Sequence, residues 1–159
     1  MNSRATIAAL TVGATLFLSG CSFAADVTTS NEYDPSDGLG TTVGAVSAEN
    51  FLLVSEGEGE PAVLVGSLYN SDRDEALKVT LTLGETTETV VIDPLTKVLF
   101  GVNDNATEVL TVSPANPGGL AEVTIGVEGQ SAETKLIPVL DGTLPEYAAV
   151  LDELKASQD

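Results

Sequence analysis

The side chains most able to do chemistry in this sequence are carboxylates in two short acidic segments. In "NSDRDE", Asn70, Asp72 and Asp74 have the spacing of the first ligands in an EF-hand calcium loop. The sixth position of that loop should be glycine and the twelfth glutamate, but they are Glu75 and Leu81. We therefore interpret the segment as a polar hairpin turn, with Asn70, Asp72 and Asp74 as weak calcium candidates. The second segment, "EGEGEP" at 56–61, has the composition of a solvated loop.

Other metal and nucleophile chemistry is excluded by composition. The sequence contains no histidine, and its one methionine is Met1. Copper, haem and ordinary zinc sites need imidazole, thiolate or thioether ligands, and Ser–His or Cys–His nucleophiles need histidine. Composition leaves open a pair of carboxylates for glycoside hydrolysis, but the chain is poor in the aromatic residues that sugar sites usually carry. We therefore predict no catalytic residues, no cofactor and no enzyme activity, with an enzyme of this kind as a distant third hypothesis.

The single cysteine, Cys21, follows an apolar run of fourteen residues, 5–18, which is itself preceded by Arg4. This run is too short to span a membrane and is typical of a secretory signal. Its end, Leu18-Ser19-Gly20-Cys21, resembles the bacterial lipobox, in which the cysteine sulfur receives diacylglycerol and the chain is cut before it. The resemblance implies a signal peptide at 1–20 and an anchor at Cys21, on the extracytoplasmic face of the cell membrane.

The chain is strongly acidic. It carries 24 Asp and Glu against six Lys and Arg, and cleavage before Cys21 would remove Arg4 and leave a net charge of −19. Such a chain repels nucleic acid phosphates and anionic lipid headgroups. The sequence therefore predicts no nucleic acid partner.

Behind Cys21, the polar segment 21–42 shows no apolar periodicity, and we expect a flexible tether. From residue 43, short runs rich in Val, Leu, Ile and Thr recur between Gly, Pro, Asn and Asp residues. Alternation with period two indicates half-buried antiparallel strands. The eight predicted strands lie at 43–55, 61–69, 76–83, 86–92, 96–100, 108–112, 121–127 and 133–140. This spacing predicts an all-β, immunoglobulin-like antiparallel β-sandwich over 43–142.

The last segment, 143–159, has the pattern of a short helix. Thr143 and Glu146 have the spacing of a capping box, and apolar residues follow at helical intervals. A helix of this length is marginal alone in water, so we expect it to pack on the end of its own sandwich rather than on a partner.

The overall layout resembles small actinobacterial cell-envelope lipoproteins of the LpqE-like kind. The resemblance rests on Cys21 and its tether, the opening strand "VGAVSAENFLLVSE", the segment "AVLVGSLYNSDRDEALKVTLTLG" and the closing "TKLIPVLDG". It implies an immunoglobulin-like or cupredoxin-like sandwich on the outer face of the plasma membrane, which accompanies the cytochrome bcc–aa3 respiratory supercomplex as an accessory subunit. A more distant likeness is to periplasmic copper chaperones, whose His and Met ligands have no counterpart here.

Two functions follow as hypotheses. The first is a non-catalytic, lipid-anchored accessory or scaffold subunit that docks on a membrane protein complex such as this supercomplex. The alternative is an envelope protein that binds a small ligand or a peptide with the help of calcium, through its acidic loops or its sheet edges.

Overall fold

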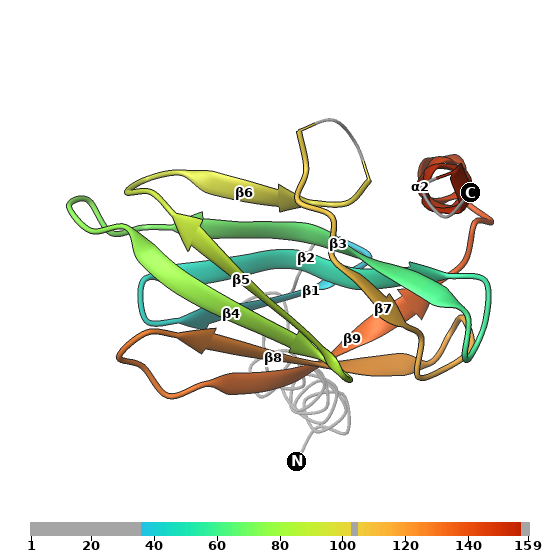
Figure 1. Cartoon of the computed structure of the whole chain (residues 1–159), viewed down its shortest axis with the longest axis horizontal. Coiled ribbons are helices and arrows are strands. Elements are labelled where there is room, and N and C mark those ends of the chain that lie inside the picture. The colour runs from blue at the N-terminus through green and yellow to red at the C-terminus, as the bar shows by residue number, and fades with distance from the viewer. Residues whose placement is uncertain (1–35, 103–104, 157–159) are drawn as a thin grey trace, which may run out of the picture. The chain divides into compact units, whose positions relative to one another are not determined.

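The computed structural model describes residues 36–102 and 105–156, which fold as a β-sandwich with one helix after the last strand (Figure 1). The sequence-based prediction of an all-β sandwich with a C-terminal helix is confirmed. The helix is α2, Pro145–Ala156. The strands are β1 Leu39–Val43, β2 Val46–Ser55, β3 Pro61–Asn70, β4 Leu77–Leu83, β5 Thr86–Ile92, β6 Lys97–Phe100, β7 Leu110–Val112, β8 Leu120–Val127 and β9 Glu133–Leu140.

The two layers of the sandwich are joined through β9. One layer contains β1, β2, β3, β6 and β7, and the other has the order β5-β4-β8-β9. β9 pairs antiparallel with β8, and its last residues, Val139 and Leu140, pair in parallel with Leu53 and Val54 of β2. The strand therefore connects the layers at one end of the sandwich.

The core between the layers is aliphatic apart from two phenylalanines. Alternate residues of β4 and β8 point inward, as their sequence pattern predicted, and are fully or almost fully buried. Phe51 and Phe100 meet edge to face, with their ring centroids 5.7 Å apart. The sandwich is thus held by close packing of many small side chains, each contributing a modest share of the hydrophobic stabilisation.

The start of the domain differs from the prediction. The first strand, β1, begins at Leu39, inside the segment assigned to the tether. The predicted strand 43–55 is divided by a turn at Gly44, which has a φ of +60° and lets β1 fold back antiparallel on β2. Only Val43 of β1 is buried, so its polar sequence carries no apolar pattern. Pairing with β2, rather than local composition, makes it a strand.

Helix α2 packs on its own sandwich, as expected, and lies over the outer face of β2 and β3 near one end. Tyr147, Leu151 and Leu154 form a second apolar cluster with Leu52, Val54 and Val63. This cover explains why residues 63–68 are apolar on both faces.

The helix also begins one residue later than the capping-box spacing indicated. The Leu144 carbonyl accepts the first helical hydrogen bond, from Ala148 N at 2.9 Å, and Pro145 occupies the first helical position. Proline is favoured there because it has no N–H that would need a partner. Thr143 lies before the cap, and its N–H donates to Asp141 Oδ1 instead.

Candidate functional site

The three calcium candidates hold the β3–β4 connection together. Asn70 is fully buried, and its Nδ2 donates to the main-chain oxygens of Glu75 and Ile92 at 2.9 and 3.0 Å. Its Oδ1 accepts the N–H of Asp72 at 2.9 Å. The carboxylate of Asp72 accepts the N–H groups of Asp74 and Glu75, which lower its pKa. These side-chain oxygens therefore stabilise a loop rather than converge on a cation.

The predicted hairpin at this loop is wrong, because β3 and β4 lie in different layers. The loop is a crossover, and Asn70 fixes it by bridging to the end of β5. The other acidic loop, Glu56–Glu60, precedes β3, whereas the Asp72 loop follows β3. The structure therefore places the two acidic loops at opposite ends of the sandwich. Among residues 36–102 and 105–156, no three His, Cys, Asp or Glu side chains gather closely enough to hold a metal ion.

Cys21 lies outside the described residues, but the point where the chain joins the domain is visible. Gly38 N donates to Asn50 Oδ1 at 2.7 Å, and the Tyr147 hydroxyl of α2 donates to the carboxylate of Asp37 at 2.9 Å. Burial of Tyr147 and its bond to Asp37 raise the pKa of this hydroxyl to about 12. The described part of the chain therefore begins beside α2. No helix in the described part of the chain is long and apolar enough to cross a membrane.

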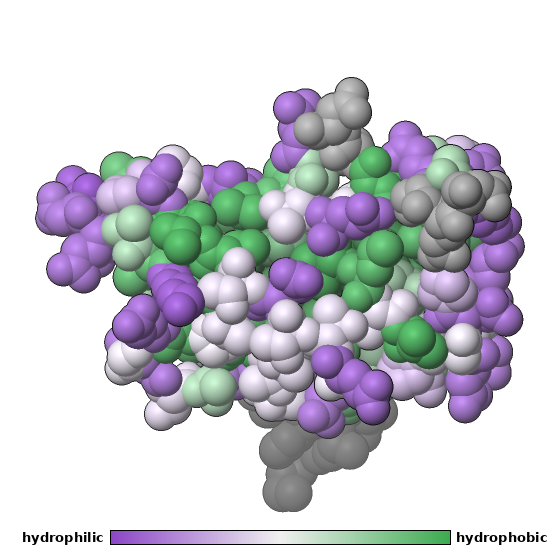
Figure 2. Space-filling view, viewed as in Figure 1, coloured by the Kyte–Doolittle hydropathy of each residue, from purple (hydrophilic) through white to green (hydrophobic). Residues whose placement is uncertain are grey.

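The charged residues are distributed unevenly along the sandwich. We define the α2 end as α2, the loops after β2 and β9, the β4–β5 turn and the start of β8. Figure 2 shows hydrophilic residues at both ends, including the right edge, where α2 and the β2–β3 loop lie in Figure 1, so the two ends differ in the sign of their charges rather than in polarity. Nine carboxylates lie at the α2 end: Glu56, Glu58, Glu60, Glu85, Glu122, Asp141, Glu146, Asp152 and Glu153.

Only one described basic residue, Lys155, lies at the α2 end. The other four are Arg73, Lys78, Lys97 and Lys135, which lie in the crossover loop or in the first three residues of β4, β6 and β9, at the opposite end. The nine carboxylates come from five separate segments, so sequence reasoning missed this grouping. The grouping could have been predicted from the sequence by noting which end of its predicted strand each acidic residue adjoins.

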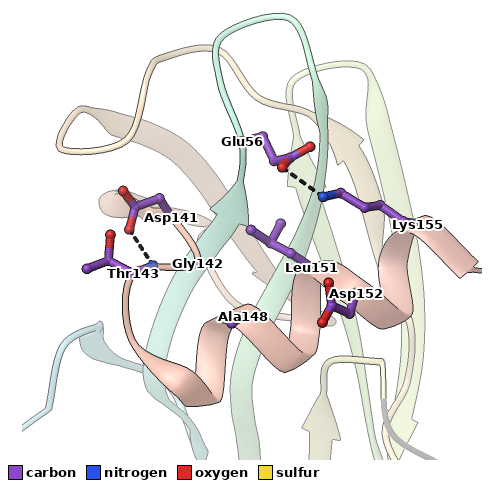
Figure 3. Close-up of a pocket in the computed structure, with 8 residues that line it drawn as sticks. All are labelled: Glu56, Asp141, Gly142, Thr143, Ala148, Leu151, Asp152 and Lys155. Atoms are coloured by element: carbon purple, nitrogen blue, oxygen red, sulfur yellow. Dashed lines mark hydrogen bonds and ion pairs between the residues drawn. The ribbon is translucent and has the colours of Figure 1, made fainter.

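A pocket of about 380 Å³ opens between α2 and the β2–β3 loop (Figure 3). Glu56 reaches across the pocket to Lys155, whose Nζ lies 2.8 Å from Glu56 Oε1. This ion pair raises the pKa of Lys155, and hydrogen bonds from Thr143 lower the pKa of Asp141. The pocket wall contains carboxylates and one paired lysine, but neither a nucleophile–base pair nor an imidazole. The carboxylates in its wall would attract a positively charged group.

No family model and no curated protein matches this chain. Solved structures do match. The "Apo PCuAC domain from PmoF1" is 15% identical over 64% of this chain and 98% of its own, with a TM-score of 0.51. The "Copper-bound PCuAC domain from PmoF2" is 23% identical over 65% of this chain and 98% of its own, with a TM-score of 0.49. The "apo PmoF2 PCuAC domain" is 22% identical over 67% of this chain and 98% of its own, also with a TM-score of 0.49.

The likeness to the first of these domains concerns the fold. Protein copper sites use imidazole, thiolate or thioether ligands. This chain has no histidine, and its one methionine and one cysteine are Met1 and Cys21. The residues of the described domain therefore do not fit a copper site of that kind.

Proposed function

We propose that this protein is a non-catalytic lipoprotein, anchored through Cys21 outside the cell membrane, that docks as an accessory or scaffold subunit on a membrane protein complex. The lipobox-like sequence before Cys21 supports the anchor. The attachment of Asp37 to Tyr147 supports a fixed point at which the anchor segment meets the domain.

The observation that carries the proposal is the unequal charge of the two ends. The α2 end carries nine carboxylates and only one described lysine, Lys155, which is paired with Glu56. A charge distribution of this kind steers a protein towards a surface of opposite sign and orients it on arrival. Anionic headgroups would repel the same surface, so a basic protein surface is the fitting target.

The LpqE-like resemblance makes the cytochrome bcc–aa3 supercomplex the first complex to examine. An affinity tag inserted at Gly129 would leave the α2 end free, because this turn lies at the opposite end and a side chain built on Gly129 meets no atom within 4 Å. Purification in mild detergent at low salt should yield stoichiometric subunits of one complex. Their recovery should fall as salt rises, because surface charge attraction is screened. Recovery of the tagged protein alone, in several detergents and after crosslinking in native membranes, would remove the proposal.

A further inference from the structure

Large apolar side chains are exposed around Glu122, which lies near the start of β8. Val112 ends β7 and is 62% exposed, and Leu120 and Leu136, on β8 and β9, are each 54% exposed. The register pairs Leu120 with Pro138 and Glu122 with Leu136. Leu120 and Leu136 are therefore diagonal neighbours across the strand pair, within reach of each other.

A crevice of about 100 Å³ lies between Val112 and Glu122 and leads towards the core. Its walls include Val112 and Pro114 on one side, Gly84 on the β4–β5 turn, and Ala121 and Glu122 on β8. Most of its lining is apolar, and its deepest residues include Leu53 and Leu83, which belong to the buried core. The volume suits one small apolar side chain.

Two threonines hold the crevice open by bridging the layers. Thr111 Oγ1 donates to the Leu83 carbonyl at 3.1 Å, and Thr86 Oγ1 donates to the Leu110 carbonyl, also at 3.1 Å. These bonds fix β7 against the β4–β5 turn, so the crevice is formed before anything binds. A preformed site avoids the entropic cost of ordering a loop on association.

We infer that Val112, Leu120, Leu136 and the crevice form a docking strip for a protein segment with an apolar side chain flanked by lysine or arginine. The inference rests on the proposed function and names the face that docks. The apolar side chain enters the crevice, and its basic neighbours meet Glu122, Glu85 and Glu60. Glu60 adjoins the residue paired with Val112, and Glu85 follows Gly84.

Charge and chain length select this occupant. A second copy that met the strip with its own α2 end would bring nine more carboxylates, and an anionic membrane would add further negative charge. Ser36 lies fifteen positions after Cys21, and a chain of that length spans no more than about 54 Å even when fully extended. An anchored domain therefore meets the parts of a complex that stand just outside the membrane.

The test uses the full chain in membranes of cells that make it. A photo-crosslinking amino acid replaces Val112 or Leu136, and Val91 provides the control. Val91 is 63% exposed on a strand and pairs with Lys78 at the opposite end. We expect crosslinks from positions 112 and 136, but not from 91, to one integral protein at a site beside Lys or Arg. Glu122→Lys should lower their yield at least about fivefold, whereas the equal charge change Glu128→Lys should leave it within about twofold.

Each other outcome overturns the inference. Crosslinks to phospholipid would make the strip a membrane-binding surface, and crosslinks to a second copy would make it a dimer interface. Equal crosslinking from position 91, or no effect of Glu122→Lys while the complex still co-purifies, would reject this face but leave the proposed function standing. Failure of the wild-type protein to co-purify with any complex would reject both.

Discussion

Replacing Leu151 with alanine tests whether α2 belongs to the domain's own core. Leu151 is 6% exposed and lies in the cluster that includes Leu52, Val54 and Val63. Burial of a leucine side chain contributes about 2 kcal/mol, and truncation also leaves a cavity, so buried Leu→Ala changes cost about 2–5 kcal/mol. Because Leu151 lies under a single surface helix that can settle, we expect a loss near the lower limit, about 2.5 kcal/mol.

Urea unfolding followed by circular dichroism measures this loss directly. At about 4 °C per kcal/mol for a domain of this size, Tm should fall by about 10 °C. The control is Leu144→Ala, just before the same helix, where the side chain is 44% exposed and the expected loss is less than about 0.5 kcal/mol. If Leu151→Ala also changes the free energy of unfolding by less than this amount, then α2 does not stabilise the domain. The helix would then be available to a partner.

Three further changes probe the polar contacts and the anchor. The raised pKa of Tyr147, about 12 rather than 10, means that its stabilising effect is complete below pH 10 and is lost as the pH rises through 12. Between these limits, wild type should lose about 2 kcal/mol more stability than Tyr147→Phe in parallel urea titrations. Asn70→Ala leaves buried carbonyls without their donor and should lower the free energy of unfolding by about 3 kcal/mol, whereas exposed Asp74→Ala should lower it by less than about 0.5 kcal/mol. Calcium should not change the Tm of wild type. A calcium-dependent rise in Tm would contradict the structural role of Asn70. Mass spectrometry should find that the mature wild-type chain starts at Cys21 and carries acyl mass. Cys21→Ser should abolish both lipidation and cleavage but leave the domain folded. A wild-type chain that starts at another residue and carries no lipid would contradict the anchor hypothesis.

The strand-forming segments were predictable because their periodicity is local. Predicted strands at 86–92 and 133–140 coincide with β5 and β9, and most of the others agree within one or two residues. Alternating apolar residues specify both a strand and its buried face, whatever the strand pairs with. The buried face of α2 was equally readable, because Tyr147, Leu151 and Leu154 recur at helical spacing.

The sequence-based errors occurred where a long-range contact replaced a local signal. β1 has one buried residue and becomes a strand by pairing with β2. The crossover after Asn70 resembles a turn, and only the burial of the Asn70 amide between Glu75 and Ile92 reveals that it joins two layers. The residues that resembled calcium ligands therefore serve the fold.

The sequence by itself determined the chemistry that this protein lacks, its acidity, its lipobox-like segment and the residues that form strands. The tertiary structure alone decided where those charges and apolar side chains meet. Gly84, Val112 and Glu122 are separated by 28 positions and then 10 along the chain, yet they line one crevice. Their proximity depends on strand order, register and the passage of β9 between layers. These are properties of hydrogen bonding between distant segments, which no local pattern encodes.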